Sequence, residues 1–145
     1  MVDLDKSSGV KEFIDGKAAK KEISYIKKKA KLFMKDKNFK DAIELYNNAI
    51  VLATNNNLRE TIIELENLIR LTQIEGLKEL KKLLEEKAYI AEDQIDYERA
   101  IEYYDKANKA ATEIFKLGGT GMQKEIKKLT NKSKELKNLL GKFYK

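Results

Sequence analysis

The chain contains no cysteine and no histidine. It therefore lacks a thiolate nucleophile, an imidazole base, and the thiolate and imidazole ligands of zinc, haem and redox centres. Aspartate and glutamate together number 24, but no spacing among them singles out a pair for acid–base chemistry. The sequence thus predicts a protein that is not an enzyme and that uses no metal ion and no cofactor.

Proline and tryptophan are also absent, and only seven glycines occur in 145 residues. No apolar run reaches the length of about 18 residues that a membrane-spanning helix needs. The first residues, Met1 to Lys6, carry charges where a secretory signal peptide has an apolar stretch. We therefore expect a soluble, cytoplasmic protein.

Charged residues make up 37% of the chain and hydrophobic residues 42%. The abundance of Lys, Glu, Leu, Ile and Ala favours helices. The apolar residues recur at helical spacing, which indicates a packed core rather than disorder. The predicted fold class is all-α.

Positive charge gathers at the two ends of the chain. Residues 1–40 hold twelve Lys against six acidic residues, residues 41–119 ten cationic against sixteen acidic, and residues 120–145 eight Lys against two acidic. The chain is therefore polarised rather than uniformly basic, and few of its cationic residues are the arginines that fork onto phosphates, so nucleic acid is not the favoured partner. The basic ends are expected to pack either near the acidic middle of their own chain or against that of a second copy, which would make a homo-oligomer.

The chain repeats itself. Residues 42–54 match residues 100–112 at seven of thirteen positions, an offset of 58. A third helix repeats at an offset of 64, and the six extra residues belong to the glycine-rich stretch 116–121, which we interpret as a helix stop rather than a phosphate-binding loop.

The repeat divides the chain. We expect a flexible arm over residues 1–20, with at most a short helix over 10–15, and similar three-helix modules over 21–75 and 76–145, unless these form one continuous domain. Asn38 and Asp96 are predicted N-caps. Because a lone glycine such as Gly76 costs a helix only about 1 kcal/mol relative to alanine, residues 58–93 can form one helix or two.

Small and aromatic residues follow the same order in both hairpins. The small ones are Ala30, Ala42, Ala49, Ala88, Ala100 and Ala107, and the aromatic ones are Phe33, Phe39, Tyr46, Tyr97 and Tyr104. The order in residues 37–50 and 96–107 resembles the second-helix signature of the tetratricopeptide repeat (TPR) family. A hairpin with a third helix is also similar to the microtubule-interacting and trafficking (MIT) domain. Both resemblances imply antiparallel helical hairpins that bind other proteins.

The TPR resemblance implies a ligand on the inner face of each first helix. In this sequence those positions are Lys27, Lys31, Met34 and Lys35 in the first hairpin, and Lys82, Glu85, Tyr89 and Glu92 in the second. The two faces have opposite charge, so we expect one extended peptide to contact both, with its acidic part near Lys27, Lys31 and Lys35 and its basic part near Glu85 and Glu92. An ordinary solvent-exposed helix face is the alternative interpretation of these charges.

The last helix carries a heptad seam in a Lys-rich sequence. The seam consists of Met122, Ile126, Leu129, Ser133, Leu136, Leu140 and Phe143. This helix is interpreted as the cap of the second module, as a seam for a partner helix, or as an amphipathic helix on an anionic membrane surface.

Together these features predict a non-catalytic adaptor or scaffold that binds a protein or peptide partner in a helical groove. The alternative is a helical protein whose basic ends bind an anionic membrane surface or nucleic acid.

Overall fold

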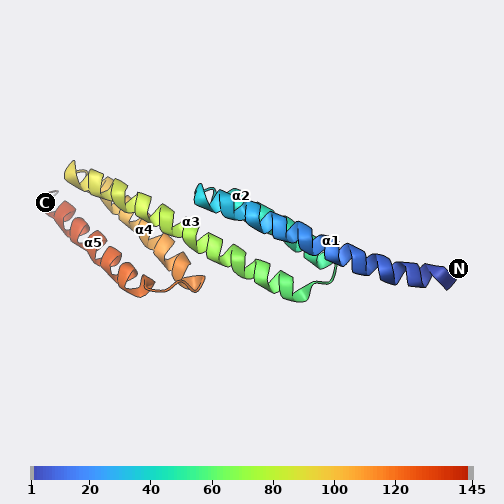
Figure 1. The fold of residues 1–145 in the computed structure, drawn as a ribbon. Coiled ribbons are helices and arrows are strands. Elements are labelled where there is room, and N and C mark those ends of the chain that lie inside the picture. Colours follow the sequence, from blue (N-terminus) through green and yellow to red (C-terminus); the bar gives the residue numbers. More distant parts are fainter. Residues whose placement is uncertain (1, 144–145) are drawn as a thin grey trace. The chain divides into compact units, whose positions relative to one another are not determined.

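The computed structural model describes the backbone of residues 2–143 and the side chains of residues 16–142. Within this part the chain is all-α, as predicted, with helices α1 (Val2–Lys35), α2 (Phe39–Asn55), α3 (Arg59–Asp93), α4 (Tyr97–Lys116) and α5 (Met122–Phe143) (Figure 1). The chain divides into two compact units, Met1–Gln73 and Ile74–Lys145, and the division falls inside α3. Each unit is described by itself below.

Helix α1 is longer than the sequence predicts, and α3 is the longer of the two predicted alternatives. Helix α1 begins at Val2, so residues 2–20 are helical where we expected an arm with at most a short helix. Gly9 and Gly16 do not end it, because a glycine weakens a helix without removing a backbone donor as proline does. For the same reason Gly76 does not interrupt α3, which settles the open question about residues 58–93 in favour of one helix.

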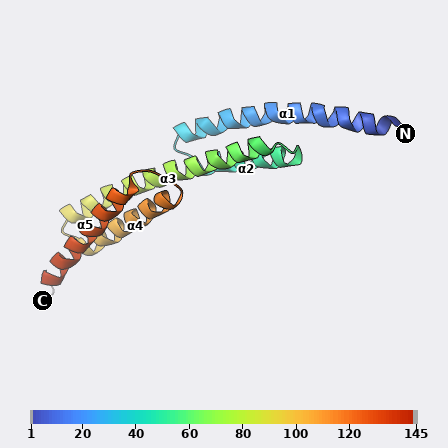
Figure 2. The ribbon, with the colours of Figure 1, turned by 90° about the horizontal axis from the view of Figure 1, so that it is seen from below.

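Unit 1 (Met1–Gln73) packs α1 and α2 against the first part of α3. Its core buries four alanines completely, Ala30 of α1 and Ala42, Ala49 and Ala53 of α2, beside the ring of Tyr46. Leu65 of α3 is also fully buried in this cluster. Small side chains therefore lie where helices come close together, as the sequence predicts, and α1 and α2 lie side by side (Figure 2).

Unit 2 (Ile74–Lys145) packs the last part of α3, α4 and α5 around its own core. Ala88 of α3 and Ala100 and Ala107 of α4 are completely buried beside Tyr104. Leu129 and Leu136 of α5 belong to the same cluster. This core holds α5 against the α3–α4 hairpin, and α4 and α5 are neighbours in both ribbon views.

Equivalent turns lead into α2 and α4. Lys37 and Ile95, which are 58 residues apart, both take a left-handed φ of 60°. The following residues are the predicted N-caps: Asn38 Oδ1 accepts from the Asp41 amide, and Asp96 Oδ1 accepts from the Arg99 amide, both at 3.3 Å. Both predicted caps are confirmed.

The glycine-rich stretch before α5 is a helix stop. Gly118 and Gly121 have φ values of 89° and 78°, which favour glycine. A Cβ on Gly119 would lie 2.3 Å from Cγ2 of Ile114, so only glycine fits this close approach. Local chain geometry thus accounts for all three glycines.

Candidate functional site

A groove of about 350 Å³ lies in unit 2 between α3 and α5, and Tyr104 of α4 also lines it. We call it the α3/α5 groove. Its walls are formed by Glu85 and Tyr89 from α3, Tyr104 from α4, and Lys128, Leu129, Asn131, Lys132 and Glu135 from α5. Two of these residues, Glu85 and Tyr89, are among those predicted from the sequence to bind a partner.

Glu92, a third predicted residue, ties the groove's three helices together. Its carboxylate accepts a hydrogen bond from the Tyr104 hydroxyl at 2.9 Å and forms an ion pair with Nζ of Lys132 at 2.6 Å. Burial, and then the bond to Glu92, raises the pKa of Tyr104, and the bond to Glu92 raises the pKa of Lys132. Near neutral pH Tyr104 is therefore a hydrogen-bond donor and not a base.

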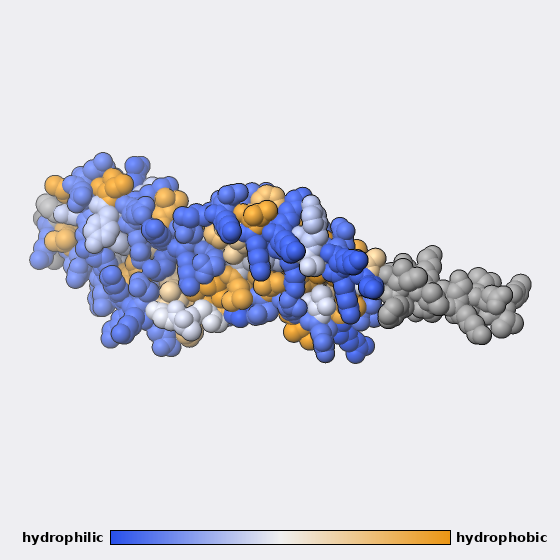
Figure 3. Space-filling model, viewed as in Figure 1, coloured by the Kyte–Doolittle hydropathy of each residue, from blue (hydrophilic) through white to orange (hydrophobic). Residues whose placement is uncertain are grey.

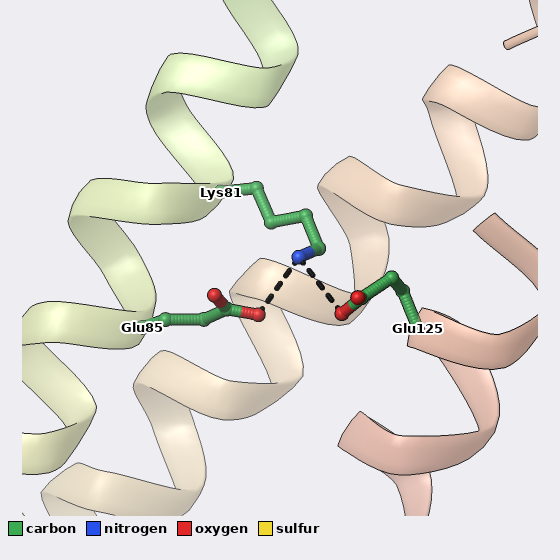
Figure 4. A network of polar contacts seen from close by, with 3 residues as sticks. All are labelled: Lys81, Glu85 and Glu125. Atoms are coloured by element: carbon green, nitrogen blue, oxygen red, sulfur yellow. Dashed lines mark hydrogen bonds and ion pairs between the residues drawn. The ribbon is translucent and has the colours of Figure 1, made fainter. Parts of the chain in front are cut away.

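Lys81 makes a second bridge between α3 and α5 (Figure 4). Its Nζ lies 2.8 Å from Oε1 of Glu85 and 3.1 Å from Oε2 of Glu125. The Lys81 side chain is only 11% exposed. Burial lowers its pKa, but the hydrogen bonds to Glu85 and Glu125 outweigh this effect and raise it overall. The bridge keeps Lys81 charged and fixes Glu85 at the wall of the groove.

The groove combines an apolar surface with charges of both signs. Leu129 is buried and Tyr89 is 65% exposed, so a bound chain could cover the Tyr89 ring. Glu85 and Glu92 stand on α3, and Lys128 and Lys132 stand on α5. Such an aromatic ring and such charged groups bind a ligand through apolar contact and hydrogen bonds. Their arrangement therefore favours ligand binding as the role of this groove.

The other predicted residues do not join this groove. Lys82 is exposed on α3 but does not line it. In unit 1, Lys27 pairs with Glu64 of α3, and Met34 packs against the core. Lys31 and Lys35 are exposed on α1.

Sequence reasoning missed the contribution of α5. The resemblance to TPR repeats directs attention to the first helix of each hairpin, whereas Lys128, Asn131, Lys132 and Glu135 belong to the third. The signal was the pair of lysines beside the predicted heptad seam. Lys128 comes directly before the buried Leu129, and Lys132 follows it by about one turn.

The heptad seam of α5 is occupied within unit 2. Leu129, Ser133 and Leu136 are buried, and the Ser133 hydroxyl donates to Oδ1 of Asp105 on α4 at 2.7 Å. The polar interruption in the seam is thus matched by a polar partner. The side chain of Phe143, the last predicted seam residue, lies outside the described side chains.

Comparisons with protein-family models, with curated proteins and with solved structures find no match for this chain. Among its described helices, none combines the length and the apolar character that crossing a membrane requires.

Proposed function

We propose that the protein is a non-catalytic adaptor that binds a peptide in the α3/α5 groove of unit 2. The observation that carries this proposal is the convergence of Glu85 and Tyr89 on one groove of about 350 Å³, with Glu92 joining the same helices. A volume of this size is within the usual range of about 300 to 1,000 Å³ for ligand sites.

The chemistry of the walls favours a peptide with an apolar side chain next to an acidic one. Tyr89 and Leu129 offer an apolar contact, and an exposed aromatic residue can bury a large area at little entropic cost. Lys128 is exposed beside them, whereas Lys132 is already paired with Glu92. An acidic side chain of the peptide would therefore pair with Lys128.

We further propose that the two units are equivalent three-helix modules with TPR-like hairpins, and that an MIT-like module is the second choice. Their fully buried alanines support this equivalence, because they occupy matching positions. At the groove the modules differ. Lys27 corresponds to Glu85, and Glu64 corresponds to Lys128, so the charges are exchanged. Lys27 and Glu64 form an ion pair between α1 and α3. In unit 2, Glu85 pairs with Lys81 instead.

The experiment uses the full chain and peptides selected against it from a displayed random library. Tyr89→Ala and Lys128→Glu should each weaken binding by about tenfold, because they remove the apolar contact and the charge partner. Lys134→Glu is the matched control, since Lys134 is exposed on α5 but does not line the groove. Selected peptides that bind all three variants like the wild type would contradict the proposal.

The same variants separate the peptide proposal from the alternative of binding to anionic vesicles or nucleic acid. Such binding would fall steeply with salt and would not depend on Tyr89. The buried seam gives α5 little apolar surface to insert into a bilayer, since Leu129 and Leu136 face the core.

A separate variant tests the wider prediction that the same peptide also contacts the first helix of unit 1. Lys31→Glu with Lys35→Glu reverses two exposed charges without touching the core. Weaker peptide binding with unchanged stability would support that prediction, and unchanged binding would confine the site to unit 2.

A further inference from the structure

A second groove lies between α3 and α4, and no residue of α5 lines it. It consists of a cavity of about 350 Å³ with Leu77, Leu80 and Leu84 on its α3 side, and one of about 160 Å³ next to it with Lys87, Ile90 and Tyr103 in its walls. We call it the outer groove. It shares no lining residue with the α3/α5 groove.

The spacing of its lining residues suits a helix. On α3 they recur every three or four residues from Leu77 to Gln94, and on α4 they do so from Arg99 to Glu113. Two neighbouring helices that each present such a row form the surface on which a third helix packs in a left-handed bundle. The α3 row covers about 18 residues, or about 25 Å of helix.

Large apolar side chains remain exposed along this row. Of its lining residues, Leu80 is 46% exposed and Ile90 58%. Scattered apolar residues are normal on a protein surface, but a continuous row beside an apolar groove marks an interaction site. The face of the molecule drawn in Figure 3 is mostly hydrophilic, with separate hydrophobic patches.

The rim of the outer groove is basic. Lys87, Arg99, Lys106 and Lys109 line it, against the single acidic residue Glu113, which pairs with Lys116. Two of these cations form exposed ion pairs outside the lining, Arg99 with Asp96 and Lys106 with Glu102. Nζ of Lys87 and Nζ of Lys106 lie 5.9 and 6.0 Å from the centre of the Tyr103 ring. Two cations thus flank one aromatic ring at the middle of the groove.

This basic rim is not a general property of the hairpin. The residues of α2 that correspond to Arg99, Lys106 and Lys109 at the offset of 58 are not cationic; they are Asp41, Asn48 and Val51. Of the exposed apolar lining residues, Ile90 recurs as Leu32, which is 61% exposed, but Leu80 corresponds to Glu22. The combination of an apolar groove with a basic α4 side is therefore particular to unit 2.

We infer that the outer groove binds an amphipathic helix with an apolar stripe and acidic flanks. The apolar stripe would cover Leu80, Leu84 and Ile90, and the acidic flanks would meet Lys106 and Lys109. This site lies apart from the α3/α5 groove, so it does not depend on the function proposed there.

The test uses two designed helical peptides of about 18 residues. Both carry leucine at heptad positions a and d, one with glutamate and one with lysine at the flanking positions, at concentrations where each is monomeric. Binding to the full chain is measured by fluorescence anisotropy at low and high salt. The glutamate peptide should bind at least about tenfold more tightly than the lysine peptide, and this preference should shrink with salt.

Two variants place the peptide in the groove. Leu80→Glu should weaken binding of the glutamate peptide by at least about tenfold, and its exposed position should leave the fold intact. Lys106→Glu with Lys109→Glu should reverse the preference between the two peptides. Lys127→Glu with Lys134→Glu is the matched control, because it makes the same charge change at exposed α5 residues outside both grooves.

Four results would overturn the inference. The first is equal binding of both peptides, and the second is binding that survives Leu80→Glu. The third is self-association of the chain that Leu80→Glu abolishes, because the occupant would then be a second copy. The fourth is binding that is lost in Tyr89→Ala but kept in the outer-groove variants, because the peptide would then bind in the α3/α5 groove.

Discussion

The Lys81 bridge offers a quantitative test of how unit 2 is held together. Replacing Lys81 by methionine keeps an unbranched apolar side chain of similar length but removes the charge that holds Glu85 and Glu125. These two carboxylates would then face each other without a cation. We expect Lys81→Met to lower the free energy of unfolding.

The magnitude follows from the exposure of the three side chains. Removing one partner of a fully buried ion pair costs about 3 to 5 kcal/mol, and an exposed pair is worth about 0 to 1 kcal/mol. Lys81 is 11% exposed, but Glu85 and Glu125 keep 31% and 35% of their side-chain surface in water. A loss of about 1 to 2 kcal/mol is therefore expected for Lys81→Met.

Unit 1 supplies the compensating variant. Ile23 corresponds to Lys81 and Thr61 corresponds to Glu125, and Ile23 is 3% exposed in the core of unit 1. The double variant Lys81→Ile with Glu125→Thr should recover part of this loss, because it leaves a single carboxylate, Glu85, which keeps 31% of its side-chain surface in water, instead of two that face each other.

Urea unfolding followed by circular dichroism measures these changes, and amide hydrogen exchange in α4 and α5 assigns them to unit 2. A Lys81→Met protein as stable as the wild type would show that the bridge contributes nothing. A double variant as unstable as Lys81→Met would show that the two units do not pack equivalently at this position.

Four further predictions concern stability and association. Ala42→Leu and Ala100→Leu should each lower the free energy of unfolding by about 1 to 3 kcal/mol through overpacking, because both alanines are completely buried. The control is Ala18→Leu, since Ala18 is exposed. Unchanged melting temperatures in both core variants would contradict the hairpin packing. Because the pKa of Tyr104 is raised above 10.0, its contribution is complete below that pH and is lost as the pH rises through the folded-state pKa. The wild type should thus lose more stability than Tyr104→Phe in alkaline urea titrations, and parallel losses would count against this. Ile95→Asn should stabilise the protein by about 0.5 to 1 kcal/mol in the same assay, since Ile95 is 67% exposed and has a φ of 60°; a loss of stability would be the contrary result. Sedimentation should show association at low ionic strength that high salt removes, and a monomer at every ionic strength would dismiss pairing between basic ends and acidic middles.

The buried parts of the fold could be predicted because packing restricts which residues fit there. Ala42 and Ala100 have equivalent burial, and the caps Asn38 and Asp96 accept equivalent bonds. Helix lengths were harder to predict. Nothing in the sequence distinguishes a glycine that ends a helix from one that lies within it, as Gly76 does, because the difference of about 1 kcal/mol is decided by neighbouring contacts.

The candidate site could be predicted only on its α3 side. Glu85, Tyr89 and Glu92 follow from their place on the first helix of a hairpin, but Lys128 and Lys132 depend on the angle at which α5 packs. The prediction also treated Lys27 as an exposed charge. Its partner Glu64 lies 37 residues away in the chain, and helical periodicity within one segment does not reveal such a pair.

Comparison of the two units explains why buried and exposed positions differ in what the sequence reveals. At the offset of 58, the completely buried alanines keep their residue, as in Ala49 and Ala107, because a larger side chain would separate the helices. Exposed positions have no such constraint, so Asn48 corresponds to Lys106 and Lys27 to Glu85. Equivalent surfaces of the two units therefore present different charges, and a ligand that fits one unit is not expected to fit the other.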